Sequence, residues 1–555
     1  MKLHSWTVSA FIAASTLCLG SATTLAQQNK QPDKKPNIVV IMTDDVSWDN
    51  VGVYSQGVKS IKTPNIDKLA AEGMRFTDYY SQPSCTAGRS AFITGQLPIR
   101  TGLYAILLPG SPGGIQASDP TMAKFLQQEG YVTAQFGKNH LGDLNEYLPT
   151  VHGFDEFWGY LYAPDFLSFE YQADWPKNQP EFNNQFGPRQ LIYSWAQEKD
   201  DPTIDPRWGR VGKQKIKNDG PAPVERRKKL DEEITKHTVD FIERSAKADK
   251  PFFVWMNTQR AHVFTYLSDK YQAMLDADTG LQDVIMREVD DNVGVVLKTL
   301  DDLKIADNTI VIFTSDNGPQ TITWPDGGTT PFRGSKGTTW EGGFRVPTII
   351  RWPGHVPAGV VENGVFDATD WMPTLVAAAG GPSDLVSQLQ LGYKDYKVHL
   401  DGYNQLDLIT GKGKSARNEV FLYQGNDLQA IRFQDWKAHL IIQPEGWFGP
   451  KVKLEVPQMY NLRRDPWEKD VEESGMHVKW DMERVWMVVP FQLLINLHQQ
   501  SFNNFPARKQ EGGLQPPNIK YVPVENLPTH PPSSSSSAPA NTSAPAQSTP
   551  PPANK

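Results

Sequence analysis

Two short apolar segments that end in acidic residues constrain this chain more than any other feature. Residues 37–42 are rich in Val and Ile, and Asp44 and Asp45 follow them after a single threonine. Residues 309–313 have the same character and lead into Asp316 and Asn317. Continuous β-branched runs of this length are typical of strands buried on both faces, as in parallel sheets. The sequence therefore predicts two buried strands with matching polar ends.

Helical patterns separate these strands along the chain. A third apolar run covers residues 252–256, and amphipathic stretches cover 63–73, 120–130, 231–246 and 282–303. Alternating strands and helices indicate an α/β fold whose mostly parallel central sheet is flanked by helices on both faces. Ligands of such sheets bind at the carboxyl ends of the strands, where the acidic residues lie.

The pattern changes near residue 402. Four short strands joined by turns are predicted at 420–423, 428–432, 436–441 and 458–462, followed by a helix over 481–499. We therefore expect a catalytic domain over 36–402 and a smaller antiparallel-sheet-plus-helix domain over 403–505. Residues 160–223 show little periodicity, and we interpret them as a long loop insertion that covers one rim of the site.

The two ends of the chain have the compositions of targeting and tail segments. Residues 1–26 combine Lys2, an apolar core and a small-residue ending, as in a secretory signal peptide. Residues 27–35 form a polar spacer, and 506–555 comprise an extended segment followed, past residue 527, by a Pro- and Ser-rich tail that we expect to be disordered. No stretch after the leader is long and apolar enough for a membrane span. We expect an exported protein, periplasmic or secreted.

Charge argues against a nucleic-acid-binding surface. The chain has 55 Lys and Arg against 63 Asp and Glu, a formal net charge of −8, and no basic block stands out. Proteins that bind nucleic acids neutralise phosphates with clustered basic residues.

The acidic strand ends form a candidate metal site. Asp44, Asp45, Asp316 and Asn317 offer oxygen donors only, which suits Ca²⁺ or Mg²⁺ better than zinc. Adjacent carboxylates repel unless a cation lies between them. Either pair alone is explained more simply by helix capping or turn formation, whereas both pairs at buried strand ends favour the metal. Ca²⁺ is preferred because carboxylate-rich shells suit the larger ion, and Mg²⁺ also fits.

Cys85 is the only cysteine left once the predicted leader is removed, so it cannot form an internal disulfide. A buried free cysteine is often a small hydrophobic residue of the core. Here it lies just before a predicted helix start at Ser90, where anions are favoured, and Arg89 can return to the same spot to bind a tetrahedral oxyanion. A thiolate is a poor partner for a hard cation, which hints that the working atom is an oxygen derived from this cysteine.

The segment around Cys85 resembles a motif of the sulfatase family, within the alkaline-phosphatase superfamily, and the similarity is greatest to bacterial arylsulfatases. In that family the cysteine of Cys-x-Pro-x-Arg is oxidised to formylglycine by a maturation enzyme, and the hydrated aldehyde is a geminal diol. Cys85-Thr86-Ala87-Gly88-Arg89 matches with Ala87 in place of the proline. The resemblance, which spans residues 36 to about 505, implies that position 85 completes the metal shell.

Three further motifs follow the family pattern. Residues 137–142 resemble Gly-Lys-x-His-Leu-Gly and contain Lys138 and His140. His262 falls where the family has a Pro-His motif, and Lys336 precedes a Glu-Gly-Gly-x-Arg-Val-Pro signature at 341–347. Outside this ordered context, a lone lysine or histidine is usually solvated or structural.

The resemblance implies hydrolysis of a sulfate monoester, on a small molecule or a saccharide, through a sulfated hemiacetal at position 85. Arg89, Lys138 and Lys336 would neutralise the sulfuryl oxygens. His262 would protonate the leaving oxygen. His140 would take the proton from the second hydroxyl of the diol, which releases sulfate and restores the aldehyde.

Two alternatives remain at the level of the sequence. A phosphodiester or phosphonate monoester hydrolase of the same superfamily would use the same scaffold. A non-catalytic, cation-binding surface protein would keep Cys85 unmodified.

Overall fold

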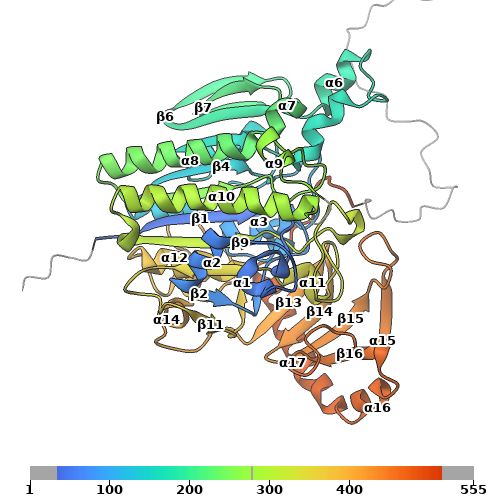
Figure 1. Ribbon diagram of the computed structural model, residues 1–555. Helices are drawn as coiled ribbons and strands as arrows, with labels where there is room; N and C mark the ends of the chain where they lie inside the picture. The colour runs from blue at the N-terminus through green and yellow to red at the C-terminus, as the bar shows by residue number, and fades with distance from the viewer. Residues whose placement is uncertain (1–33, 277–278, 516–555) are drawn as a thin grey trace, which may run out of the picture. The chain divides into compact units, whose positions relative to one another are not determined.

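A mixed sheet organises the larger part of the protein, which a computed structural model describes over residues 34–276 and 279–515 (Figure 1). Within those residues the sheet has ten strands, and its five central neighbours run parallel. In spatial order these five are β9 (Thr309–Ser315), β1 (Asn37–Thr43), β8 (Phe252–Asn257), β4 (Val132–Lys138) and β5 (Glu156–Tyr160). The predicted signal peptide, most of the polar spacer and residues 516–555, which include the whole Pro- and Ser-rich tail, lie outside the described residues.

Shorter strands extend the sheet on both sides. Antiparallel β10 (Thr348–Arg351) pairs with β9 and leads to β2 (Met74–Phe76) and β11 (Val360–Glu362). On the other side, β6 (Leu191–Asp205) and β7 (Gly209–Gly220) pair antiparallel beyond β5. The predicted α/β class with a mostly parallel central sheet is confirmed.

Helices cover both faces of this sheet because the central strands are apolar on both. Val39 and Ile41 of β1 pack on the side of α8 (Leu230–Lys247) and α10 (Leu281–Asp302), which lie next to each other in Figure 1. Ile38 and Val40 point to the other face, which is covered by α3 (Cys85–Thr94), α5 (Met122–Gln128) and α12 (Trp371–Ala378). This alternation is the two-residue period of a strand.

Most predicted elements of this domain are confirmed. The runs at 37–42, 252–256 and 309–313 are β1, β8 and β9. The helical patterns are α2 (Pro64–Ala71), α5, α8 and α10.

The prediction of a long loop over 160–223 is wrong for much of that segment. It contains η4 (Pro164–Tyr171), α6 (Pro180–Phe186) and the hairpin β6–β7. The outer parts of this hairpin are largely exposed, so their sequence lacks the apolar alternation by which half-buried strands are identified.

The predicted C-terminal sheet is confirmed, with β13 (Glu419–Gln424), β14 (Asp427–Phe433), β15 (Trp436–Ile442) and β16 (Val452–Asn461) in antiparallel order. The helix predicted at 481–499 is divided into α16 (His477–Met482), η8 (Val485–Met487) and α17 (Val488–Asn504). Pro490 lies in the first turn of α17, where a missing N–H is tolerated, so the long helix starts only there. Among the described helices, none has the length and apolar character needed to cross a membrane.

Buried ion pairs attach this sheet to the main domain. Lys437 of β15 contacts Glu341 of α11 (Glu341–Phe344) at 3.0 Å, and Arg432 of β14 contacts Asp78 at 2.7 Å. These side chains are fully buried, and both acids also contact Arg345, so the two pairs belong to one buried charge network. The Lys437–Glu341 pair fixes the Glu-Gly-Gly segment at 341–343 against the small sheet.

The packing of α10 predicts different effects for two neighbouring valines. Val293 is fully buried, whereas Val295 is 48% exposed. Val293→Ala should lower the free energy of unfolding by about 1–3 kcal/mol, because it removes buried methyl groups and leaves a cavity. Val295→Ala, the matched control, should stay within about 0.5 kcal/mol of the wild type. Equal denaturant midpoints for both variants would contradict this packing.

Candidate active site

The register of two parallel strands brings the acidic residues together. Thr43 at the end of β1 lies opposite Ser315 at the end of β9, so the residues that follow both strands meet at one edge. Asp44, Asp45 and Asp316 each place a carboxylate oxygen within 4.8 Å of the others, and all three are buried. Asp45 adopts a φ of 60°, which short polar side chains tolerate better than most.

Each carboxylate contacts a different buried cation. Lys138, at the end of β4, pairs with Asp44. Lys336 donates to Asp45 Oδ1 at 2.6 Å. Arg89 Nε donates to Asp316 Oδ2 at 2.9 Å. Three negative and three positive side chains are therefore interleaved where the strands end.

These charges shift the pKa values of the acids in opposite directions. Burial disfavours ionisation of Asp44, but the positive charges of Lys138 and Arg89 outweigh it and lower its pKa. For Asp316, burial and the neighbouring charge of Asp44 raise the pKa to about 6 despite Arg89.

Unpartnered buried oxygens indicate that these residues fit a cation. Asp45 Oδ2 and Asn317 Oδ1 are buried and accept no hydrogen bond, while Asn317 Nδ2 donates to Asp45 Oδ1 at 2.6 Å. Leaving buried acceptors unpaired costs free energy, which a ligated cation would recover. Because the available donors are carboxylate and amide oxygens, the set fits a hard ion such as Ca²⁺ or Mg²⁺.

Cys85 is the first residue of α3, which starts five residues earlier than the sequence indicated. Its Sγ lies 3.5 Å from Asp44 Oδ1 and is fully buried. Burial, followed by the charge of Asp44, raises the pKa of the thiol to about 12. An unmodified Cys85 is therefore protonated at neutral pH, which makes it a weak nucleophile and a weak metal ligand.

Arg89 is oriented by a residue that the sequence reasoning missed. Its Nη1 donates to Asn257 Oδ1 at 2.7 Å and to the Lys138 carbonyl at 3.2 Å. Asn257 ends β8 between the two strands that carry Asp44 and Lys138. Its position at the end of a buried strand was the signal that could have revealed it.

The pKa values of the two candidate histidines are both lowered, and each histidine has one ring nitrogen hydrogen-bonded to the backbone. His140 Nε2 lies 3.1 Å from the Leu107 carbonyl, and its buried Nδ1 has no partner. Burial and the charge of Lys138 hold the pKa of His140 well below its usual value. His262 Nδ1 lies 3.1 Å from the carbonyl of Val263, the next residue.

His262 lies between two acids. Its Nε2 lies 3.8 Å from Asp45 Oδ2, and its Nδ1 lies 3.8 Å from Asp165 Oδ1. Burial and the charge of Lys336 lower its pKa. Asp165 belongs to η4, so the segment 160–223 does reach the site, but nothing in the sequence marked this residue.

The structure thus gathers every residue predicted for the site into one buried network of contacts and charges. They are Asp44, Asp45, Cys85, Arg89, Lys138, His140, His262, Asp316, Asn317 and Lys336.

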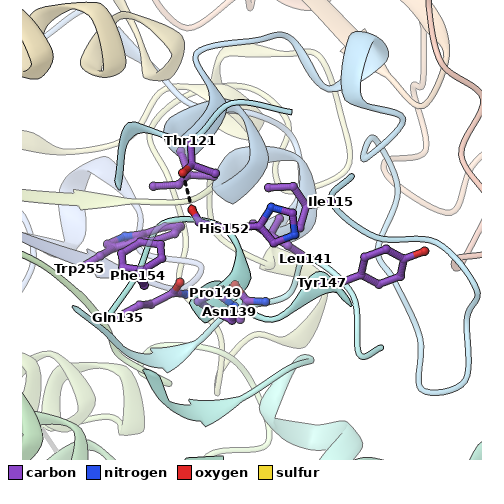
Figure 2. Close-up of a pocket in the computed structure, with 11 residues that line it drawn as sticks. Ile115, Thr121, Gln135, Asn139, Leu141, Tyr147, Pro149, His152, Phe154 and Trp255 are labelled. Atoms are coloured by element: carbon purple, nitrogen blue, oxygen red, sulfur yellow. Dashed lines mark hydrogen bonds between the residues drawn. The ribbon is translucent and has the colours of Figure 1, made fainter. Parts of the chain in front are cut away.

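A small internal cavity nearby is too small for a substrate. Figure 2 shows side chains that line it, among them Gln135, Asn139, Leu141 and Trp255. Its volume is about 10 Å³. His152 also lines it, and its Nε2 lies 2.8 Å from the Glu146 carbonyl. This histidine is structural, as the sequence suggested.

A parallel sheet whose strand ends hold three acids and an amide, with a buried cysteine beside an arginine, is the arrangement of the alkaline-phosphatase superfamily. Residues 36–381 match the profile of the family described as Sulfatase. The chain belongs to the sulfatase family and hydrolyses sulfate esters, which confirms the resemblance seen in the sequence.

Three comparisons illustrate this membership. N-acetylgalactosamine-6-sulfatase of Canis lupus familiaris is 32% identical over 467 residues, 78% of this chain and 81% of that protein. Arylsulfatase A of Homo sapiens is 32% identical over 459 residues, 78% and 83% of the two chains. The crystal structure of PsFucS1 sulfatase from Pseudoalteromonas sp. matches with a TM-score of 0.72 at 32% identity, covering 85% of this chain and 92% of that one.

Gly88 is predicted to be essential for the approach of α3 to β9. A Cβ at this position would lie 1.9 Å from the carbonyl oxygen of Asp316, which belongs to the backbone and cannot rotate away. We expect Gly88→Ala to destabilise the fold by about 2 kcal/mol or more, since the helix or the strand end must shift. Gly475→Ala is the control, because nothing lies within 4 Å of its added Cβ. Thermal unfolding of both variants tests this, and a wild-type midpoint for Gly88→Ala would contradict it.

Proposed function

We propose that the protein is an arylsulfatase-type enzyme, exported to the periplasm or medium, whose Cys85 is converted to formylglycine by a maturation enzyme. The observation that carries the proposal is the buried contact of 3.5 Å between Cys85 Sγ and Asp44 Oδ1, inside a cluster of three acids and three cations. A thiol gains nothing from such surroundings, whereas an oxygen nucleophile facing a tetrahedral anion does.

The cation would be held by Asp44, Asp45, Asp316 and Asn317, with Ca²⁺ preferred over Mg²⁺. With residue 85 as a hydrated aldehyde, the site would supply a nucleophilic oxygen of lowered pKa and a positive charge beside the sulfuryl group.

The side chains of this chain do the remaining work. Arg89, Lys138 and Lys336 are all buried cations next to position 85, and their N–H groups would bind the sulfuryl oxygens. These three cations would stabilise the transition state because they are already in position before the reaction. A buried array of fixed charges needs no reorganisation when negative charge develops. Asn257 holds Arg89 in orientation by accepting from its Nη1 at 2.7 Å.

The two histidines would move protons at different atoms. With its Nε2–H donated to the Leu107 carbonyl, His140 presents an unprotonated Nδ1 that can take a proton. With its Nδ1–H donated to the Val263 carbonyl, His262 has Nε2 as its reactive nitrogen. The positive charge of Lys336 acts on the His262 ring. Lys336 would therefore help His262 deliver a proton to the leaving oxygen.

A sulfated amino sugar is the second candidate substrate class. The sequence identity to the canine N-acetylgalactosamine-6-sulfatase, 32%, favours it. The identity to human arylsulfatase A is the same. Both substrate classes present a sulfate monoester and differ only in the leaving group.

Mass spectrometry of the peptide that contains residue 85 tests directly whether Cys85 is modified. Conversion to formylglycine exchanges sulfur for oxygen and removes two hydrogens, so the tryptic peptide that contains residue 85 should be lighter by about 18 Da. Cys85→Ala should lower kcat/KM for nitrophenyl sulfate by about 10⁴-fold or more, as removal of a nucleophile does. An unmodified peptide in an active enzyme would refute the proposed nucleophile.

The reaction class is tested by comparing nitrophenyl sulfate with nitrophenyl phosphodiesters and phosphonate monoesters under steady-state conditions. We expect kcat/KM to favour the sulfate by orders of magnitude. The reverse preference would assign the chain to the alternative hydrolases of the superfamily, and no turnover of any ester would support a non-catalytic role.

Metal binding is tested by titrating Ca²⁺ and Mg²⁺ into chelator-treated protein in a calorimeter. Asp45→Asn should weaken Ca²⁺ binding by about 10-fold or more, because it removes a charged oxygen donor. Asp302→Asn, an exposed acid at the end of α10, is the control and should bind as the wild type does. Equal affinities for the two variants would mean that Asp45 is not a ligand.

A further inference from the structure

His262 lies on an irregular loop that follows β8, and we call residues 258–266 the His262 loop. These residues form neither helix nor strand. A loop of this kind has no ladder of its own to hold it, yet its buried N–H and carbonyl groups need partners. Side chains from neighbouring helices and the backbone at Asp44 supply several of them.

Two backbone hydrogen bonds join the His262 loop to Asp44. The Asp44 N–H donates to the Arg260 carbonyl at 3.1 Å, and the Ala261 N–H donates to the Asp44 carbonyl at 2.7 Å. The loop and the end of β1 are therefore fixed to each other immediately before His262. A displacement of residues 260–261 would change the position of His262 relative to Asp44.

The side chain of Arg260 connects this part of the loop to its far end and to α10. Its Nη2 donates to the Tyr266 carbonyl at 2.9 Å. Its Nε donates to Glu288 Oε2 at 3.0 Å, and Nη2 also reaches Oε1 at 3.3 Å. A guanidinium makes these bonds in fixed directions from one plane, which the single ammonium group of a lysine cannot do.

Asp231, in the first turn of α8, holds the backbone at the start of the loop. Its Oδ1 accepts from the Gln259 N–H at 2.8 Å, and its Oδ2 accepts from the Arg260 N–H at 3.2 Å. Asp231, Arg260 and Glu288 are all fully buried. Their hydrogen bonds go to one another and to the backbone, so these residues differ from the cations that face position 85.

We propose that Arg260, held by Glu288 and Asp231, is a positioning residue for the reaction. It closes the His262 loop and thereby fixes the proton donor relative to Asp44 and the bound ester. The inference rests on the proposed sulfatase reaction, in which a proton passes from His262 to the leaving oxygen as the S–O bond breaks. A displacement of about 1 Å in a reacting group can lower a rate by about 100-fold, so such anchoring has a measurable effect.

The test measures how the rate depends on the leaving group, on the full chain carrying formylglycine. The probes are nitrophenyl sulfate and phenyl sulfate. Nitrophenolate leaves readily without a proton, whereas phenolate depends more on one, so a misplaced His262 should slow phenyl sulfate most. Arg260→Lys should lower kcat by about 100-fold for phenyl sulfate and by about 10-fold or less for nitrophenyl sulfate, with both KM values within about threefold.

Two variants of Glu288 cover the case in which Arg260→Lys does not fold. Burial raises the pKa of Glu288 to about 7, so an uncharged acceptor is tolerated here. Glu288→Gln keeps an acceptor for Arg260 and should keep the wild-type ratio of the two kcat values within about threefold, whereas Glu288→Ala should change that ratio as Arg260→Lys does. Glu232→Gln, an exposed neighbour on α8, is the matched control and should leave the ratio unchanged.

The proposal is overturned if Arg260→Lys, or Glu288→Ala in its place, slows both substrates equally or has no effect. It is also overturned if Arg260→Lys lowers the rate for phenyl sulfate as much in a His262→Ala background as in the wild type. Two residues that act through the same proton cannot lose its contribution twice, so their effects should not add.

Labelling of histidines with diethyl pyrocarbonate tests the positioning role without catalysis. His262 is only 5% exposed, so the wild type should label slowly there. Arg260→Lys should label His262 about 10-fold faster or more, since about 1 Å of loop movement opens the ring to reagent, while exposed His355 labels equally in both proteins. A wild type that cleaves no sulfate ester would refute the proposed reaction, whereas equal labelling of His262 in both proteins would overturn the role of Arg260.

Discussion

Repulsion among three buried carboxylates is the constraint on which the rest of this structure depends. Asp44, Asp45 and Asp316 lie within 4.8 Å of one another because β1 and β9 run parallel in register. At such a separation, two like charges repel by about 4 kcal/mol at an effective dielectric constant of 20. The fold therefore has to bring positive charge to this edge of the sheet, and it does so from separate elements.

The elements that supply these charges are tied to one another through the backbone. The Gly337 N–H donates to the Pro83 carbonyl at 2.7 Å, which links the segment of Lys336 to the turn before Cys85. The Lys336 N–H donates to the Pro319 carbonyl at 3.0 Å, close to Asn317. A substrate anion would thus meet an array whose charges are fixed by main-chain contacts, which is the arrangement that favours electrostatic catalysis.

The acidic residues of the site could be predicted from the sequence because they directly follow strongly apolar strands. The family motifs supplied Arg89, Lys138, His140, His262 and Lys336, whose meeting depends on loops that no local pattern describes. Asn257 and Asp165 were missed since a single polar residue after a strand or in a short 3₁₀ segment has no distinctive signature. The β6–β7 hairpin was missed for a related reason: strands exposed to solvent lack the periodicity that burial imposes.

The central claim is that a hard cation and an oxygen derived from Cys85 meet where β1 and β9 end. Anomalous diffraction from crystals of the mature protein grown with Ca²⁺ tests it most directly. The account predicts one strong peak ligated by Asp44, Asp45, Asp316 and Asn317, with an oxygen of residue 85 completing the shell. Density for an intact thiol at residue 85, or a calcium peak elsewhere with none at these four side chains, would contradict it.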